Sequence, residues 1–447
     1  MSRVLKPRFN SENMTITTKI IPPISADQQH HQQQINFDPY LNNLDLDILI
    51  VGAGFSGIYL LYNLRKKGYK VKIFEAANGL GGTWRVNHYP GARVDSDQPV
   101  YELSIPEIWK EWNWKEKYPG WKELQQYFHY CDKILDIKKD VSFNTKVMEA
   151  NFDKDEGKWM IKSEDGKIVK AKYFLPCIGF AAKRYIPDFP GIETFKGEIH
   201  HSSEWPESEV DVAGKRCAVI GTGSTGVQII QEFAKKAKSL VVFQRTPNLC
   251  LPMAQRNLSP EEQKNQKHGY PNFFLQRTTH FGGFVLDFLP RDTFDDSPEE
   301  REKVFEALWN QGNFSFWIGG YRDLFFNLEA NFEAYNFWAK KVRAKIEDPK
   351  KRDILAPLKP PHPFGTKRPS LEQDYYQIEE AQEKWSIEIQ EMANLTLFPL
   401  ADSWYMGANI PGKKREMLNY SAGVPKYAEI LKNNLKNNLE GYHLVQN

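Results

Sequence analysis

The sequence predicts an α/β fold with two Rossmann-like dinucleotide-binding domains and a helical insertion. The first observation is a short apolar strand, Ile48–Val51, that leads directly into a glycine-rich turn, a helix and a second strand. The second observation is a repeat of the same unit, which begins at Ala218. In such units the glycines let a diphosphate approach the helix N-terminus, and a residue after the second strand contacts a ribose.

Composition indicates a globular protein of two or three domains. The chain has 447 residues, of which 41% are hydrophobic, and its formal net charge is only +2. This balance gives no indication of a nucleic acid partner. No apolar run is long enough for a membrane span. The four cysteines form no C-x-x-C pair, so we expect no structural metal and a cytoplasmic location; they are Cys131, Cys177, Cys217 and Cys250.

Residues 1–44 are expected to form a disordered tail, because they contain a glutamine and histidine run at 28–34 and few large apolar residues. Metal binding by His30 and His31 and a transit peptide are the alternatives. The composition favours a solvated tail over both.

The first unit, within a domain predicted at 45–190, has the order strand, glycines, helix, strand and acid. Gly52, Gly54 and Gly57 form the turn, and Glu75 follows the strand Val71–Phe74. Glu75 can accept hydrogen bonds from a ribose diol, and its charge repels a 2′-phosphate. We therefore predict that this unit binds FAD, against the alternative of a glycine turn without a ligand.

The second unit opens the domain predicted at 210–360. Its turn comprises Gly221, Thr222, Gly223, Ser224, Thr225 and Gly226, and a helix is expected over Val227–Ala237. Gln244 stands where the first unit has Glu75, and Arg245 and Thr246 follow it. A cation at this point attracts a 2′-phosphate, so this unit is predicted to bind NADPH. The alternative for Arg245 is an ordinary surface arginine.

Three further segments carry a family resemblance. They are Gly81–Trp84 (GGTW), Tyr89–Asp95 (YPGARVD) and Phe195–Pro206 (FKGEIHHSSEWP), the last within a linker predicted at 191–209. They resemble motifs of the Baeyer–Villiger monooxygenases, and the resemblance extends from Asp45 to Tyr442. It implies that the flavin lies against Gly82, Thr83, Trp84, Tyr89, Asp95 and Val147.

Between the motifs, Val141–Val147, Trp159–Lys162 and Ile168–Tyr173 are expected to form hairpins, and Phe174–Gly179 a closing strand. The chain between Ser259 and Asp348 is expected to be mainly helical, with a capping box at Ser297. Its aromatic residues are more typical of core than of a substrate pocket; they are Phe314, Phe316, Trp317, Tyr321, Phe325 and Phe326.

The proline-rich segment 361–376 presents the adjacent cations Lys367 and Arg368 before Pro369. On extended backbone these two side chains point in opposite directions and can serve different ligands. The resemblance assigns Lys367 to the 2′-phosphate and Arg368 to the flavin face, with Asp95 orienting Arg368. From the residues alone, a solvated basic pair and a turn cap at Asp95 are the alternatives.

After Tyr376 the resemblance breaks, because a block as long as a small domain is absent before the C-terminal remainder of the FAD domain, 377–447. In the family this block includes a strand that closes the flavin lobe, so its absence would expose a sheet edge and apolar surface. Trp404, in the remainder, is expected beside the nicotinamide, against the alternative of an aromatic packed in a loop.

The resemblance implies an FAD-dependent Baeyer–Villiger monooxygenase of the NADPH-dependent class EC 1.14.13. With NADPH and dioxygen it would insert oxygen beside a ketone carbonyl through a C4a-peroxyflavin, giving an ester or lactone. A flavin monooxygenase that oxidises nitrogen or sulfur is one alternative. A shortened pseudoenzyme that binds cofactor without oxygenating is another.

Overall fold

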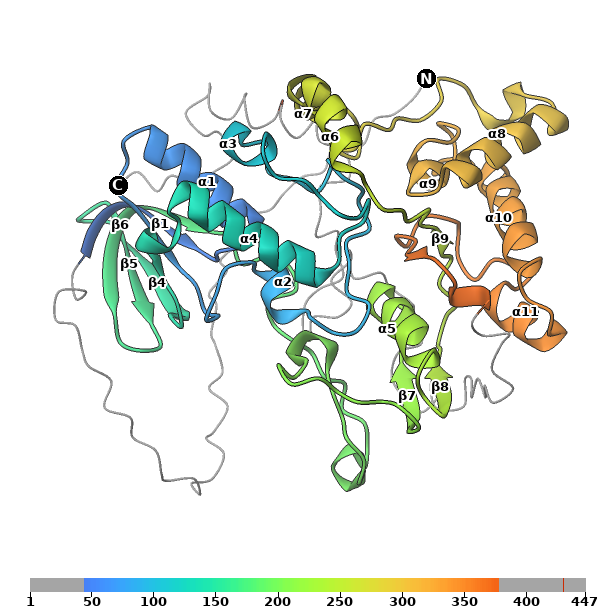
Figure 1. Ribbon diagram of the computed structural model, residues 1–447, viewed down its shortest axis with the longest axis horizontal. Helices are drawn as coiled ribbons and strands as arrows, with labels where there is room; N and C mark the ends of the chain where they lie inside the picture. The colour runs from blue at the N-terminus through green and yellow to red at the C-terminus, as the bar shows by residue number, and fades with distance from the viewer. Residues whose placement is uncertain (1–43, 378–428, 430–447) are drawn as a thin grey trace, which may run out of the picture.

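The computed structural model describes residues 44–377 and residue 429 as an α/β protein (Figure 1). A sheet crossed by α1 and α4 lies on one side of the view, β7, α5 and β8 lie at the lower centre, and α8 to α11 lie at the opposite edge. Most of the predicted tail and of the predicted C-terminal remainder, including Trp404, lies outside the described residues.

The first sheet has six strands in the order β3-β2-β1-β6-β5-β4. β1 pairs in parallel with β2 and β6, and β2 with β3, whereas β4, β5 and β6 pair antiparallel. The strands are β1 (Leu44–Val51), β2 (Val71–Phe74), β3 (Val141–Ser142), β4 (Val147–Asp153), β5 (Lys158–Ser163) and β6 (Ile168–Pro176). This is the strand–turn–helix–strand unit expected at residues 48–75.

Burial explains the first sheet's strands and helices. Leu49 and Ile50 of β1 point to opposite faces of the sheet, and both are fully buried because a hydrophobic cluster covers each face. Phe55, at the start of α1 (Phe55–Lys66), packs on Tyr127 and Phe128 of α4 (Trp121–Leu135) with ring centroids 6.0 and 4.8 Å apart. The pair of helices thereby covers the sheet near the first glycine turn. Two short helices lie between them, α2 (Thr83–Val86) and α3 (Pro106–Trp109).

Two strand predictions in this region were wrong. Residues 141–147 are not one hairpin strand: the two-residue β3 adds in parallel to β2, and the hairpin's first strand begins only at Val147. Residues 174–179 form no separate strand, because β6 continues from the hairpin to Pro176 and pairs with β1 from Val169 to Pro176. One strand therefore serves both the antiparallel hairpin and the parallel sheet.

The second unit consists of β7 (Arg216–Ile220), α5 (Ser224–Ala234) and β8 (Ser239–Phe243), with β7 and β8 parallel. The helix ends at Ala234 instead of Ala237, because the amides of Lys236 and Ala237 both donate to the Phe233 carbonyl and close the last turn. A second pair of parallel strands, β9 (Leu251–Pro252) and β10 (Leu371–Glu372), joins the unit to the segment after Arg368.

The chain between Ser259 and Asp348 is mainly helical, as expected, and one more helix follows it. The capping box at Ser297 is confirmed, because the Ser297 hydroxyl accepts from the Glu300 amide and the Glu300 carboxylate accepts from the Ser297 amide. The helices are α6 (Pro260–Gln266), α7 (Tyr270–Gln276), α8 (Pro298–Gln311), α9 (Ser315–Ile318), α10 (Leu328–Arg343) and α11 (Pro349–Leu355). Short 3₁₀ turns are η2 (Lys138–Asp140), η3 (Ile192–Thr194), η4 (Ser202–Glu204), η5 (Lys267–Gly269) and η6 (Thr293–Asp295).

One hydrophobic cluster extends from the first unit through α5 and β8 into the helical insertion. Phe314, Phe316 and Tyr321 belong to it, so their interpretation as core is confirmed, whereas Phe326 is 89% exposed. A smaller cluster, with Leu49, Phe74 and Ile161, fills the other side of the first sheet. The two units therefore share a core.

Residues 44–377 contain neither a helix suited to a membrane nor a cluster of metal-ligating side chains. No described helix is long and apolar enough to cross a bilayer. No group of three or more histidine, cysteine, aspartate or glutamate side chains in the same residues could hold a metal ion.

Candidate active site

The first glycine turn is held by close backbone contacts. Gly52 has φ +104°, and a Cβ there would lie 2.5 Å from the Cys177 carbonyl oxygen. A Cβ on Gly57 would lie 1.9 Å from the Gly52 carbonyl oxygen. No side chain caps α1, whose N-cap is Gly54. Its first amides therefore point out of the turn toward the place where a diphosphate would lie.

Glu75 fixes the same turn from the end of β2. Its carboxylate is buried and accepts hydrogen bonds from the amides of Ala53 (2.6 Å) and Ala77 (2.7 Å), one on each oxygen. A carboxylate oxygen can accept more than one hydrogen bond, so each retains capacity for a ribose hydroxyl. Glu75 is thus placed at the glycine turn, as its position after the strand predicts.

The GGTW segment lies against this turn. A Cβ on Gly82 would lie 3.0 Å from the Gly54 Cα, so the two glycine backbones are in contact. Thr83 begins α2, and the Trp84 indole donates a hydrogen bond to the Tyr101 hydroxyl at 2.9 Å. The backbone at Gly82 and the N-terminus of α1 therefore form one surface.

Asp95 and Arg368 form an ion pair, although they are far apart in the sequence. Their side chains are 19% and 28% exposed. The Arg368 guanidinium also lies 5.7 Å from the centre of the Phe314 ring. The two residues predicted to act in catalysis are thus brought together at the junction of three segments, 89–97, 313–318 and 361–370.

Tyr89 lies between the two units. Its hydroxyl donates to the Gln228 Oε1 of α5 at 2.9 Å and is 3.3 Å from the Thr225 hydroxyl. The Gln228 amide group in turn donates to the Arg93 carbonyl at 3.0 Å. Burial raises the pKa of Tyr89. Gln228 was not predicted, because no local pattern indicates a contact between separate units.

The second glycine turn repeats the first. A Cβ on Gly226 would lie 2.1 Å from the Gly221 carbonyl oxygen, whereas one on Gly223 would meet no atom within 4 Å. The Thr222 hydroxyl donates to the Thr246 carbonyl at 3.2 Å. Arg245 is exposed beside this turn. The turn is therefore tight at its base and open on the side where a ligand would approach.

Ser370 and Asn248 connect the second turn to the Lys367-Arg368 segment, and neither was predicted. The Asn248 amide group donates to the Thr222 carbonyl and to the Ser370 hydroxyl, both at 2.7 Å. The hydroxyls of Ser224 and Ser370 are 2.9 Å apart. These bonds hold the segment that carries both cations against the N-terminus of α5. Lys367 itself is partly buried.

Val147 and the segment Phe195–Pro206 are two further features predicted from the resemblance. Val147 begins β4 and packs against the smaller hydrophobic cluster. In the segment Phe195–Pro206, Trp205 is only 9% exposed and Phe195 is 62% exposed. The His88 ring lies 3.1 Å from the Pro206 carbonyl oxygen, which joins this segment to the first unit.

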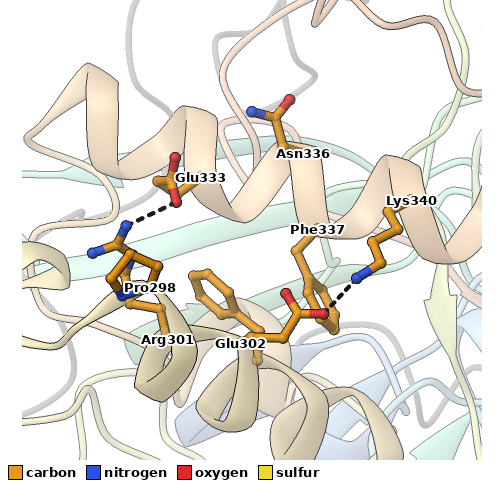
Figure 2. A pocket seen from close by; sticks show the side chains of 8 residues that line it. Pro298, Arg301, Glu302, Glu333, Asn336, Phe337 and Lys340 are labelled. Atoms are coloured by element: carbon orange, nitrogen blue, oxygen red, sulfur yellow. Dashed lines mark hydrogen bonds and ion pairs between the residues drawn. The ribbon is translucent and has the colours of Figure 1, made fainter.

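A separate pocket of about 160 Å³ lies between α8 and α10 (Figure 2). Its walls carry two ion pairs, Arg301 with Glu333 (3.4 Å) and Lys340 with Glu302 (2.6 Å), as the dashed lines show. Its lining comes only from these two helices, so it is distinct from the glycine turns.

A family model described as flavin-binding monooxygenase-like matches residues 46–318, which hold both glycine turns and Asp95. The chain belongs to this flavin-binding monooxygenase-like family. It is 51% identical over 338 residues to the FAD-binding monooxygenase acrE of Aspergillus aculeatus, across 76% of this chain and 57% of that one. It is 36% identical to the cyclopentanone 1,2-monooxygenase of a Comamonas species, across 92% and 98% of the two chains.

Solved structures give the same result. OTEMO in complex with FAD and NADP is 35% identical, with a TM-score of 0.73 over 76% of this chain and 64% of that chain. Cyclohexanone-bound cyclohexanone monooxygenase is 31% identical, with a TM-score of 0.73 over 79% and 67%. The recognition of Baeyer–Villiger relatives and the α/β fold are therefore confirmed.

The chain is short for its family. It spans 57% of acrE and 60% of the FAD-binding monooxygenase VdtE of Byssochlamys spectabilis. The match to cyclopentanone 1,2-monooxygenase extends over 541 positions, more than the 447 residues present here. That relative therefore contains sequence without a counterpart in this chain; its location after Tyr376 stays a prediction.

Proposed function

We propose that the chain is an FAD-dependent Baeyer–Villiger monooxygenase that uses NADPH and dioxygen to insert oxygen beside a ketone carbonyl. The observation that carries the proposal is the ion pair between Asp95 and Arg368, which lies where the segments of both nucleotide units meet. Relatives named for ketone oxidation, such as cyclopentanone 1,2-monooxygenase, support a ketone as the substrate class.

The first unit fits FAD. The uncapped N-terminus of α1 would hold the diphosphate, and Glu75 would hold the ribose. The Gly82 backbone contacts the same turn directly, because neither Gly82 nor Gly54 has a side chain. The contact would leave a flat surface for a ring system. When bound, the flavin supplies the chemistry that activates dioxygen.

The second unit fits NADPH. The N-terminus of α5 also has no side-chain cap, and Gly223 leaves its approach open. Arg245 is exposed at the end of β8, and Lys367 lies on the segment that Ser370 ties to this turn. These two cations would hold the 2′-phosphate through charge-assisted hydrogen bonds.

Arg368 would stabilise the negative charge that develops on the ketone oxygen. A guanidinium remains protonated at working pH and presents five donors in a fixed plane. Asp95 holds this group in one orientation, so little reorganisation is needed when charge develops. The chain's own residues thus bind, orient and stabilise, and none needs to act as a nucleophile.

A second candidate function is a cofactor-binding protein that does not oxygenate. Ile178 and Ile220, at the ends of β6 and β7, are 58% and 67% exposed. Exposed apolar side chains are what the absence of a covering block would leave, and they therefore favour this candidate. A flavin monooxygenase that oxidises nitrogen or sulfur is a weaker alternative, because the motifs at Trp205-Pro206 and Lys367-Arg368 resemble those of the ketone-oxidising family.

The deciding experiment is to purify the chain, supply FAD and record its visible absorption before and after NADPH is added. A flavin band that bleaches and returns in air, with ester or lactone formed from cyclopentanone or cyclohexanone, supports the proposal. Bleaching without oxygenated product supports the cofactor-binding alternative. Product from a sulfide or amine, but from neither ketone, supports the monooxygenase that oxidises nitrogen or sulfur. A protein that stays colourless with FAD supplied contradicts both monooxygenase functions.

A further inference from the structure

We propose that Phe314 and Trp317 position Arg368, so that the helical insertion and not only Asp95 sets the direction of the guanidinium. The inference rests on the proposed function for its catalytic meaning. The contact itself can be tested without activity. Phe314 is the N-cap residue of α9, and Trp317 lies within that helix.

Phe314 offers Arg368 a fixed ring face. The Arg368 Cζ lies 5.7 Å from the ring centre, within the range of a cation–π contact. The ring is 3% exposed and is itself held at its edges by Phe284 (centroids 5.7 Å apart, 83° between planes) and Trp317 (5.3 Å, 74°). A long arginine side chain has many rotamers, and a rigid aromatic face favours those that lie along it.

Trp317 fixes the backbone that leads to Arg368. Its indole N–H donates to the Gly365 carbonyl at 3.1 Å. Gly365 has φ +78°, and a Cβ there would lie 2.7 Å from two atoms of the indole. The indole therefore fills the space that a side chain at Gly365 would need. The chain reaches Arg368 three residues later.

Asn313 connects the same turn to the Asp95 side of the pair. Its Oδ1 accepts hydrogen bonds from the Ser315 amide and hydroxyl, both at 2.6 Å, which starts α9. Burial raises the pKa of Asp97, two residues after Asp95, while the Lys117 charge and a hydrogen bond to the Asn313 side chain act in the opposite direction. Residues 313–317 thus contact the segments of both members of the ion pair.

The test compares Phe314→Leu with Phe316→Leu. Both rings are 3% exposed and belong to the same short element. The Phe316 ring packs instead on the rings of Phe305, Phe337 and Phe364. Each change is combined with Arg368→Gln, and thermal unfolding midpoints are measured for the single and double variants in a double-mutant cycle. Phe314→Met is a second variant in case Phe314→Leu does not fold.

We expect the cycle of Phe314 with Arg368 to be non-additive by about 2 °C, and the cycle of Phe316 with Arg368 to be additive. Additivity in both cycles overturns the proposal, whether or not the protein is an enzyme. If the protein oxygenates ketones, Phe314→Leu should also lower kcat about tenfold and leave the KM for NADPH within about twofold. A protein without oxygenation contradicts the proposed function, and the cycles still decide the contact.

Discussion

Two carboxyl groups show how burial and partners set the chemistry of single residues. Asp95 is partly buried and faces a guanidinium, so its charge is balanced where it lies. Glu102 is only 5% exposed and lies in the core, beside the Trp114 indole. Burial raises the pKa of Glu102 to about 8, although Trp114 and the charges of Lys267 and Arg277 act in the opposite direction. The first arrangement suits catalysis, and the second makes folding depend on pH.

Arg368→Lys should lower the rate of ketone oxygenation, because lysine keeps the charge but loses the planar set of donors. Losing one preorganised donor costs about 2.7 to 4 kcal/mol of transition-state stabilisation, a decrease of about 100-fold or more. The measurement is the rate of ester or lactone formation at saturating NADPH and ketone. Arg256→Lys is the control, because that arginine pairs with Glu262 on the surface of the helical insertion. Unchanged oxygenation by Arg368→Lys would remove this residue from the mechanism.

Glu102→Gln should make stability less dependent on pH. The folded-state pKa lies above the ordinary 4.5, so the folded protein keeps a proton that the unfolded chain releases, and stability falls as pH rises from about 4.5 to about 8. Glutamine resembles the neutral carboxyl. The Glu102→Gln variant should therefore be stabilised relative to the parent by about 3 to 4 kcal/mol more near pH 8.5 than near pH 5, measured by urea unfolding.

The matched control is Glu164→Gln, because that side chain is 61% exposed and forms an ion pair with Lys146 at the surface. Equal pH profiles for Glu102→Gln and the parent would mean that Glu102 titrates normally in the folded protein.

At the scale of elements, the two glycine turns differ in which glycine is structural. Gly226 has no room for a Cβ, since the Gly221 carbonyl oxygen would lie 2.1 Å away, whereas Gly223 faces open space. Both precede or begin α5, whose N-terminus has no side-chain cap. One position therefore shapes the turn, and the other keeps the approach to its amides clear.

Gly223→Ala and Gly226→Ala should separate these two roles. Gly226→Ala forces the turn apart and should lower the thermal midpoint by several degrees. Gly223→Ala should leave the midpoint nearly unchanged and weaken NADPH binding about tenfold or more, because the added methyl group blocks the diphosphate. Thermal unfolding and fluorescence titration with NADPH measure the two effects. A Gly223→Ala variant that binds NADPH like the parent would place the cofactor elsewhere.

Local pattern predicted the elements whose residues are buried on both faces. The apolar runs of β1 and β2 and the glycine turns were found because strand, turn and helix follow each other within one short stretch. Residues 141–147 were misread because β3 is only two residues long, too short for an alternating pattern to show its parallel partner. Periodicity therefore works where an element is long enough to repeat.

The candidate site was only partly predictable for a related reason. The glycines and Glu75 are local features of one unit. The contact between Asp95 and Arg368 joins distant segments, and it was expected only from the family resemblance. Gln228 and Ser370 hold the two units and the Lys367-Arg368 segment together, and they have no sequence signature because hydroxyl and amide side chains are common on any surface.

At the scale of the whole molecule, the shared core favours a stable single fold, whereas exposed apolar residues favour association between molecules. One hydrophobic cluster joins both nucleotide units and the insertion, which favours a single cooperative fold. Yet Ile178, Ile199 and Ile220 are 58%, 56% and 67% exposed near the ends of β6 and β7 and in the linker between those strands. Relatives contain sequence that this chain does not. Exposed aliphatic groups of this kind favour association between molecules.

Replacing these three isoleucines together by threonine tests whether they face solvent. Surface substitutions usually change stability by less than about 0.5 kcal/mol each, so the triple variant should unfold within a few degrees of the parent. It should also elute with a larger monomer fraction in size-exclusion chromatography, because less apolar surface is available for association. Ile50→Thr is the control, since Ile50 is fully buried in β1 and its replacement should destabilise strongly. If the triple variant loses as much stability as Ile50→Thr, other parts of the chain bury these side chains, and they are not an exposed apolar surface.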